Sequence, residues 1–255
     1  MQNKTGKLLN FLLVVFLLVG LLFLGLWRDI LPARADNTNS LEEQVLSIIR
    51  AHPEAIIESV QNYQRQQEAQ QKAMQKAVVQ QMQVNPQAFI RDSPIQGAED
   101  GQNVLFMFSD FQCPFCSLAR ETVKEFMAKY GDRVTLVYKN LPLSIHPQAL
   151  NAAVAAYAAG QQGKFWQYYD GLFANQEDLG EELYQELAED LNLDLEQFDR
   201  DRNRSQAQDA IAEDIQLARS LLIQGTPFFA FNGEALSGAV DLKTLETVFA
   251  KESKE

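Results

Sequence analysis

The sequence has little cysteine and little histidine: its 255 residues include two cysteines, Cys113 and Cys116, and two histidines. Two cysteines exclude the multi-disulfide framework that stabilises small secreted domains. A structural zinc ion would need both cysteines together with His52 and His146, which lie far apart along the chain, so no metal site is predicted. The Cys-Pro-Phe-Cys spacing indicates redox chemistry instead.

Basic residues are also scarce relative to acidic ones. The chain has 22 Lys and Arg against 34 Asp and Glu, which gives a net charge of −12. Nucleic-acid binding depends on clustered basic side chains that neutralise phosphates, so no nucleic-acid partner is expected. The length allows one or two domains, each with its own core.

A long apolar run lies near the N-terminus, over residues 8–27. About 20 apolar residues span a bilayer. Lys4 and Lys7 before the run place the N-terminus inside, so the rest of the chain is expected to be exported. Residues 1–35 are therefore predicted to be a signal peptide cleaved near Ala35, or a signal anchor that is retained. Both alternatives give an extracytoplasmic, periplasm-like location.

Residues 36–90 are predicted to be a polar helical rod. A long helix is expected over residues 53–82, and one of its faces, from Ile56 to Gln81, follows the alternating four-three spacing of a coiled-coil seam. The seam is apolar at both ends and rich in glutamine in the middle, which indicates a solvated helix without the stripe needed to lie on a core. The segment is either a spacer or a homo-oligomerisation helix acting through residues 41–84.

Residues 91–255 are predicted to be a compact domain that begins with a strand, a helix and a strand. Residues 103–109 form a continuous apolar run of strand length, residues 114–130 follow as a helix, and residues 133–138 alternate as a second strand. A right-handed crossover makes the two strands parallel. It leaves Cys113 at the helix N-terminus, beside the carboxyl end of the first strand, where open α/β sheets place their chemistry.

The second half of this domain contains a long helical block. Residues 145–224 are almost wholly helical, and strand character returns at residues 227–231. Asn232-Gly233 is a strong hairpin signal, with a return strand expected over residues 234–240. A helix over residues 242–251 closes the chain. The fold class is therefore α/β, with a mixed sheet interrupted by an all-helical insert.

These motifs together resemble the DsbA-like branch of the thioredoxin superfamily. The resemblance rests on the Cys113–Cys116 motif after an apolar strand, on Gly-Thr-Pro at residues 225–227 before the hairpin, and on the helical insert; it covers about residues 93–250. It implies a thioredoxin-like mixed sheet with an inserted all-helical subdomain, preceded by a long N-terminal helix. The preceding helices resemble N-terminal segments of some exported members that oligomerise.

The resemblance also implies a reaction and the residues that perform it. The chain would be a thiol:disulfide oxidoreductase that oxidises or isomerises disulfides in exported cysteine-containing proteins. Cys113 would attack, Cys116 would resolve the mixed disulfide, and Pro227, in the cis form, would present Thr226 to the substrate chain. No cofactor is implied. The implied partner is a membrane protein, either a quinone-linked oxidase or a thiol reductase.

The chemistry of the motif can also be argued from its residues. Disulfide exchange needs an accessible, acidic thiol and a second thiol nearby. A helix N-terminus favours negative charge, so the pKa of Cys113 is expected to fall to about 4–7. Cys116, one turn further into the helix, is expected to have less solvent access. Pro114 and Phe115 would tune the thiolate, and Phe115, in place of the histidine of the family's strongest oxidants, favours a less oxidising couple.

Proton transfer is less clearly assigned by the sequence. Many relatives carry a buried glutamate six residues before the first cysteine, where this sequence has Met107. Transfer would then use water, the backbone, or a neighbour such as Asp110 or Lys139. His146 has two interpretations. It is either a helix-capping or surface histidine, or a participant in the chemistry near the dithiol.

A rival interpretation belongs to a different class of protein. The chain would be a non-catalytic chaperone or assembly module in which Cys113 and Cys116 form a structural disulfide. A thiol titrating near the ordinary pKa of about 8.5, or no accessible thiol after reduction, would favour this alternative. In either case, the aromatic residues at 165–173 are expected to form the core of the helical insert, and the acidic stretch 181–196 a solvated face.

Overall fold

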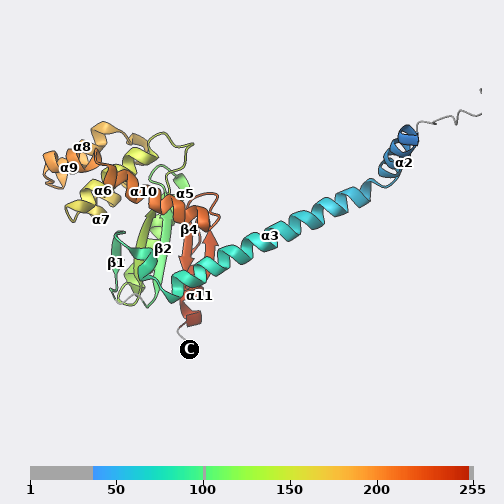
Figure 1. Ribbon diagram of the computed structural model, residues 1–255. Coiled ribbons are helices and arrows are strands. Elements are labelled where there is room, and N and C mark those ends of the chain that lie inside the picture. The colour runs from blue at the N-terminus through green and yellow to red at the C-terminus, as the bar shows by residue number, and fades with distance from the viewer. Residues whose placement is uncertain (1–36, 100–101, 253–255) are drawn as a thin grey trace, which may run out of the picture. The chain divides into compact units, whose positions relative to one another are not determined.

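The computed structural model describes residues 37–99 and 102–252, and the chain divides into two compact units, residues 1–64 and 65–255 (Figure 1). The apolar run at residues 8–27 and the cleavage position near Ala35 lie outside the described residues. None of the helices over the two described ranges is both long and apolar enough to cross a membrane.

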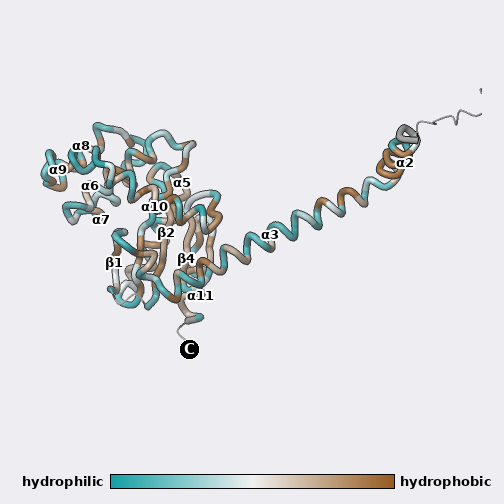
Figure 2. Tube along the Cα trace, viewed as in Figure 1, coloured by the Kyte–Doolittle hydropathy of each residue, from teal (hydrophilic) through white to brown (hydrophobic). Residues whose placement is uncertain are grey.

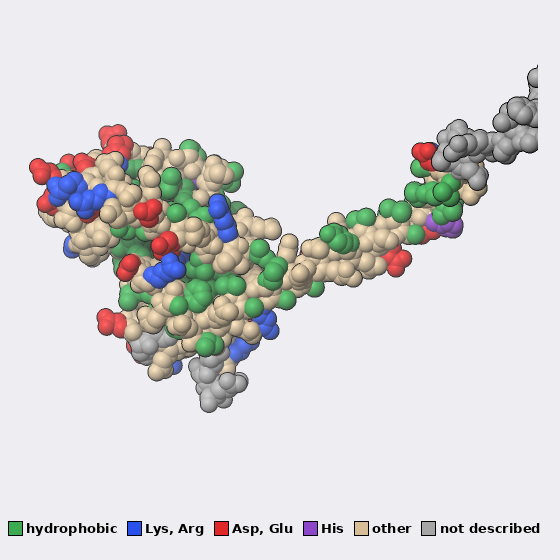
Figure 3. Space-filling view, viewed as in Figure 1, with side chains coloured by type: hydrophobic (Ala, Val, Ile, Leu, Met, Phe, Trp, Pro, Cys, Tyr) green, Lys and Arg blue, Asp and Glu red, His purple; other side chains and the backbone are tan. Residues whose placement is uncertain are grey.

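In the first unit, apolar side chains lie on the helix surface. It contains α2 (Asn37–Ala51) and the first turns of α3 (Pro53–Val84). Figure 3 shows hydrophobic side chains over both segments, and Figure 2 shows hydrophilic stretches along the middle of α3. The exposed apolar residues here are Leu41, Val45, Leu46, Ile48, Ile49, Ile56, Ile57, Val60 and Tyr63.

The second unit contains a five-stranded mixed sheet in the order β1-β3-β2-β4-β5. The central strands β2 (Val104–Ser109) and β3 (Thr135–Asn140) are parallel, as predicted, and every residue in both is buried. β1 (Ile95–Gly97) pairs antiparallel with β3, while β4 (Phe228–Phe231) pairs antiparallel with β2 and with β5 (Glu234–Ser237). The sheet with its helical insert confirms the predicted fold class.

The two outer strands show what the sequence pattern captured and what it missed. The hairpin between β4 and β5 is confirmed: Asn232 and Gly233 have φ of 46° and 76°, the positive values that a tight hairpin turn requires. β1 was not predicted. It has only three residues, all of them exposed, so no apolar alternation marks it in the sequence, and its pairing with β3 defines it.

Helices cover both faces of the sheet, and the alternation of side chains along β4 shows which helix packs where. Phe229 and Phe231 lie in one cluster with α5 (Pro114–Tyr130) and α11 (Leu242–Glu252). The intervening residues of β4 point to the opposite face. There they pack with the end of α3, with α4 (Gln87–Ile90) and with α10 (Ser205–Ser220).

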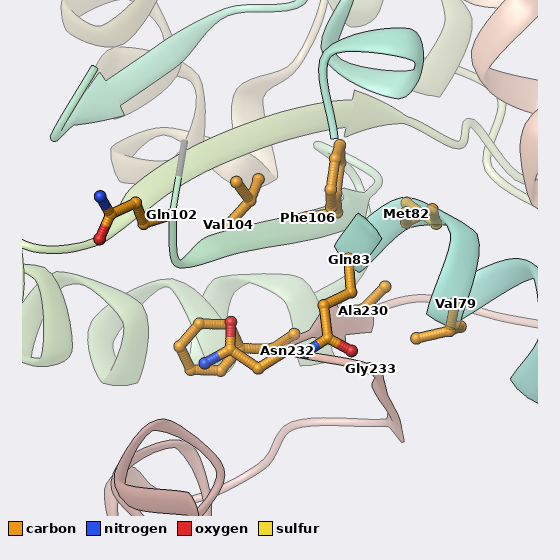
Figure 4. Close-up of a pocket in the computed structure, with 10 residues that line it drawn as sticks. Val79, Met82, Gln83, Gln102, Val104, Phe106, Ala230, Asn232 and Gly233 are labelled. Atoms are coloured by element: carbon orange, nitrogen blue, oxygen red, sulfur yellow. The ribbon is translucent and has the colours of Figure 1, made fainter. Parts of the chain in front are cut away.

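The end of α3 belongs to this core, which corrects the prediction of a helix solvated along its whole length. Val79 and Met82 are each only 1% exposed and lie in the cluster on the sheet. The Gln75 side chain donates a hydrogen bond from Nε2 to the Leu221 carbonyl, at 2.7 Å. Figure 4 shows Val79 and Met82 beside Phe106 of β2 at a cavity of about 10 Å³, which is small enough to indicate close packing. These buried residues lie off the predicted seam, whose last members, Met74, Ala77 and Gln81, are exposed.

The helical insert clusters at one end of the sheet (Figure 1). The alanines of α6 are almost all buried, and such small side chains let α7 and α9 approach closely. The aromatic residues of α7 are largely buried, as predicted, and the acidic side chains of residues 181–196 are exposed, whereas Asp201 of α9 is buried. The insert comprises α6 (Ala149–Gln161), α7 (Phe165–Ala174), the 3₁₀ helix η1 (Gln176–Asp178), α8 (Glu181–Asp190), α9 (Leu195–Arg202) and α10 (Ser205–Ser220).

Candidate active site

Cys113 lies where the chain leaves β2 and begins α5. It is the N-cap residue of the helix, in an extended conformation (φ −78°, ψ 122°), and Pro114 occupies the first helical position. Proline fits there because its missing N–H would have no partner inside the helix. The Cys116 N–H donates to the Cys113 carbonyl at 3.0 Å, which closes the first turn. Both cysteines are free thiols on this turn.

Cys113, the thiol predicted to attack, is less exposed than its sequence position indicates. Cys113 is 4% exposed and Cys116 is fully buried, so the expected order of access holds but the difference is small. The segment before β4 lies against Cys113: the Cys113 Sγ is 3.4 Å from the Thr226 carbonyl oxygen, to which the protonated thiol donates. The Thr226–Pro227 peptide bond is cis. The structure therefore brings the two predicted motifs, Cys113–Cys116 and Thr226–Pro227, into contact.

The surroundings of the two thiols shift their pKa values in opposite directions. The pKa of Cys113 is lowered to about 5, and a hydrogen bond from the Cys116 thiol is the largest cause. Burial opposes this shift. The Thr226 side chain and the backbone N–H groups of Cys116 and Phe115 lower the pKa further. Burial is the main cause that raises the pKa of Cys116. Near neutral pH, Cys113 is therefore the thiolate and Cys116 the protonated thiol.

The rate of alkylation of reduced Cys113 should follow this shift. With a pKa of about 5, the rate should be nearly flat above pH 6 and fall about tenfold per pH unit below pH 5. Because the folded-state pKa lies below the unfolded value, thiolate stabilisation is complete above the unfolded value near 9 and disappears as the pH falls through about 5. Acid-quenched iodoacetamide labelling measures the profile. Cys116→Ala, which removes the largest cause, should move the midpoint upward; an unchanged midpoint would contradict this account.

Asp110 connects the dithiol to His146. The Asp110 backbone N–H donates to Cys116 Sγ at 3.4 Å, and its carboxylate Oδ2 lies 2.7 Å from His146 Nδ1. The same carboxylate accepts from the backbone N–H groups of Gln112 at 2.7 Å and Leu143 at 2.9 Å. His146 therefore lies near the dithiol, which was one of the two alternatives, and its side chain is 18% exposed.

The other groups considered for proton transfer lie in different surroundings. The Lys139 ammonium is 3.0 Å from Asp214 Oδ1 in a buried ion pair, and the other oxygen of Asp214 accepts from Asn140. Met107 is 1% exposed and packs in the core beneath α5. Asp110, and not Lys139, is hydrogen-bonded to the buried sulfur.

Gln176 is a residue of the site that the sequence analysis missed. From η1 its Nε2 donates to the carbonyls of Phe111 and Cys113, at 2.7 and 3.0 Å. It therefore attaches the helical insert to the turn that carries the attacking thiol. A single glutamine between two helices, more than 60 residues from the motif, carries no sequence signal for this role.

Comparison with known proteins gives the family. Residues 104–250 match the family model described as the DSBA-like thioredoxin domain. The chain belongs to this family. Among solved structures, a thioredoxin-like oxidoreductase from Silicibacter pomeroyi DSS-3 is 28% identical, with a TM-score of 0.60 over 65% of this chain and 94% of that one. A linker-deletion variant of ScsC from Proteus mirabilis is 20% identical, with a TM-score of 0.63 over 88% of this chain and 99% of that one.

The curated relatives are longer proteins. The Na(+)/H(+) antiporter NhaA 3 of Salinispora tropica is 34% identical over 152 residues, which are 59% of this chain and 23% of the antiporter. The chain thus spans about a quarter of the length of the curated relatives it matches. The family model and the solved structures agree on a DsbA-like thioredoxin fold.

Proposed function

We propose that this chain oxidises or isomerises disulfides in other exported proteins through the Cys113–Cys116 dithiol. The observation that carries the proposal is the pairing of an acidic thiol with a buried, protonated one: the pKa of Cys113 falls to about 5, while that of Cys116 is raised. A thiolate is the nucleophile of disulfide exchange, and a second thiol within one helical turn can release the product.

The reaction is two successive exchanges. The Cys113 thiolate attacks a substrate disulfide, forms a mixed disulfide, and one substrate sulfur leaves as a thiolate. Cys116 then loses its proton and attacks Cys113 Sγ; the Cys113–Cys116 bond forms, and the second substrate sulfur leaves. The substrate gains two electrons and the protein loses two. Read in reverse, the same steps oxidise a substrate dithiol.

The surface around Cys113 suits an unfolded polypeptide. The Thr226 carbonyl, 3.4 Å from Cys113 Sγ, is a backbone acceptor for the N–H of a bound chain, and Thr226 and Pro227 are the proposed substrate-binding residues. Exposed apolar side chains lie close in sequence to the residues of the site: Phe115 and Leu118 on α5, Ile145 next to His146, and Leu222 shortly before Thr226 are each at least 37% exposed. We therefore infer cysteine-containing, incompletely folded proteins as substrates.

Replacing Phe115 by histidine should make the couple more oxidising. Phe115 is 60% exposed at the second position of α5, and its backbone N–H already favours the Cys113 thiolate. An imidazole there adds a donor or a charge that stabilises the thiolate, and hence the reduced form. We expect the reduction potential to rise by about 30 mV or more, about 1.4 kcal/mol. Equilibration with glutathione buffers measures it.

Ala128→His is the matched control, since Ala128 is exposed on the same helix but near its C-terminal end. Its potential should equal that of the wild type. A Phe115→His potential equal to or below the wild-type value contradicts the tuning role. The wild-type potential also bears on direction: a high value favours an oxidase recharged by a quinone-linked membrane partner, and a low one an isomerase kept reduced by a membrane thiol reductase.

We further propose export and self-association. The export proposal rests on the apolar run at residues 8–27, which either anchors the chain or is removed near Ala35. The proposed organisation is an export segment over residues 1–35, a helical segment over 36–90 and the thioredoxin domain over 91–255. Self-association through residues 41–84 is supported by the exposed apolar side chains of α2 and early α3, because such surfaces usually gain a partner.

Sedimentation and crosslinking of the exported part test the self-association. We expect an oligomer for the chain starting at residue 36, and a monomer when Ile48, Ile56 and Val60 are all replaced by serine. These three side chains are exposed, so their replacement leaves the folded core intact. A monomer in both cases contradicts the proposal. An oligomer in both cases assigns the association to another surface.

A further inference from the structure

The resolving step has a requirement that the dithiol alone does not meet. Cys116 attacks only as a thiolate, yet its sulfur is fully buried and burial raises the pKa of its thiol. A base must therefore take the Cys116 proton inside the protein. Met107 is apolar, and Lys139 is already paired with Asp214 at 3.0 Å. Among the described residues, Asp110 is the ionisable residue whose backbone N–H donates to the Cys116 sulfur.

The carboxylate of Asp110 has room for one more proton. Its two oxygens offer about four acceptor positions. Three are used, by Gln112 N–H on Oδ1 and by Leu143 N–H and His146 Nδ1 on Oδ2. The side chain of Asp110 is fully buried, whereas that of His146 is 18% exposed. His146 therefore contacts both the buried carboxylate and the solvent.

We propose that Asp110 accepts the proton of Cys116 in the resolving step. His146 acts as a positioning residue that holds the accepting carboxylate. The inference rests on the proposed function. The Cys116 S–H proton passes to the Asp110 carboxylate as the Cys116 sulfur bonds to Cys113 Sγ and the substrate sulfur departs with the electron pair. His146 Nδ1, 2.7 Å from Asp110 Oδ2, holds the carboxylate in place during this transfer.

The neighbouring groups do not replace this pair. Titratable groups on the elements packed around Asp110 are Cys113 and Cys116 of α5 and Tyr138 of β3. Burial is the main cause that raises the pKa of Tyr138 well above its usual value, so the phenol stays protonated and neutral. Lys139, also on β3, is held by Asp214. Cys113 is bonded to the substrate during this step, which leaves Asp110 and His146.

Stopped-flow reaction of the reduced protein with Ellman's reagent separates the two steps. The first release of thionitrobenzoate is second-order and reports the attack by Cys113; the second is first-order and reports the resolution by Cys116. Asp110→Asn keeps the side-chain shape and the backbone contact to the sulfur but removes the base. We expect its second phase to slow at least about tenfold, with the first phase changed by less than about twofold.

His146→Ala tests the positioning role, because it removes the contact to Asp110 Oδ2. We expect its second phase to slow while the first phase stays unchanged. His146→Asn keeps a donor for Oδ2 and should restore the wild-type second phase. His52→Ala, at the exposed histidine next to α3, is the control and should match the wild type in both phases.

The outcomes separate the inference from the proposed function. Wild-type second-phase rates in Asp110→Asn and His146→Ala overturn the inference while leaving the proposed function in place. Equal slowing of both phases in Asp110→Asn also overturns it, because that result indicates a structural role. If the wild-type protein shows no first phase, the proposed function fails, and this inference fails with it.

Discussion

Cys113→Ser is expected to lower thiol-disulfide exchange to the uncatalysed rate. The serine hydroxyl is not ionised near neutral pH, whereas the pKa of the Cys113 thiol is lowered to about 5 and the thiol is almost fully ionised there. The Cys116 thiol and the N–H groups at the start of α5 stabilise a thiolate, and serine forms no such anion near neutral pH. Reduction of an insulin-type disulfide substrate by dithiothreitol measures the loss.

Cys116→Ala gives the complementary result. Attack by Cys113 still occurs, although its thiolate is less favoured, but no second thiol is present to release the product. The variant should therefore accumulate a mixed disulfide with substrate, visible on a non-reducing gel and absent from Cys113→Ser. If neither variant changes exchange and both change only the stability, the dithiol is a structural disulfide. The non-catalytic alternative would then be correct.

Lys139→Met is expected to destabilise the fold by about 3–5 kcal/mol, as found when one partner of a buried ion pair is removed. Lys139 and Asp214 are only 3% and 10% exposed at their side chains. Burial already raises the pKa of Asp214, and Lys139 only partly offsets this. Without the ammonium, the buried carboxylate keeps its hydrogen bonds from Asn140 but has no opposite charge.

The pH dependence of this loss has a definite sign. A folded-state pKa above the unfolded one means that protonation of Asp214 favours the folded state, so its contribution to stability is lost as the pH rises. The deficit of Lys139→Met should therefore be largest near neutral pH and smaller in acid, where Asp214 takes a proton. Urea unfolding of the reduced protein at several pH values measures it.

Two further variants separate the effect of burial from the loss of a charge. Lys129→Met removes an exposed lysine, 3.5 Å from Glu246, and should leave the free energy of unfolding close to the wild-type value. Lys139→Met combined with Asp214→Leu should recover much of the lost stability, because no unpaired charge stays buried. A Lys139→Met variant as stable as Lys129→Met would contradict this assignment.

Local patterns were enough to predict the parts of the fold that neighbouring residues specify. The apolar run of β2, the proline after Cys113 and the alternation in β3 predicted a strand, a helix and a parallel strand. Asn232-Gly233 predicted the hairpin, since few residue pairs adopt two positive φ angles easily. The helical insert was visible from its length and composition. In each case, the signal lies within a few residues of the element it describes.

Other features depend on contacts that no local pattern encodes. β1 is a strand because β3 pairs with it, and α3 ends in the core because Val79 and Met82 meet the sheet. Gln176 reaches the cysteine turn from more than 60 residues away. A polar residue in a loop looks the same in sequence whether it faces water or a distant carbonyl.

The order of residues is enough to identify two sulfurs, to place one of them at the start of a helix after a buried strand, and to show that a helical block interrupts the sheet. The difference between the two sulfurs arises from folding. Thr226 lies against Cys113, Asp110 donates to Cys116, and His146 reaches Asp110 from the loop after β3. The physical reason is that helix starts and apolar runs are local properties, whereas burial and hydrogen bonding to a sulfur arise only when distant segments pack around it.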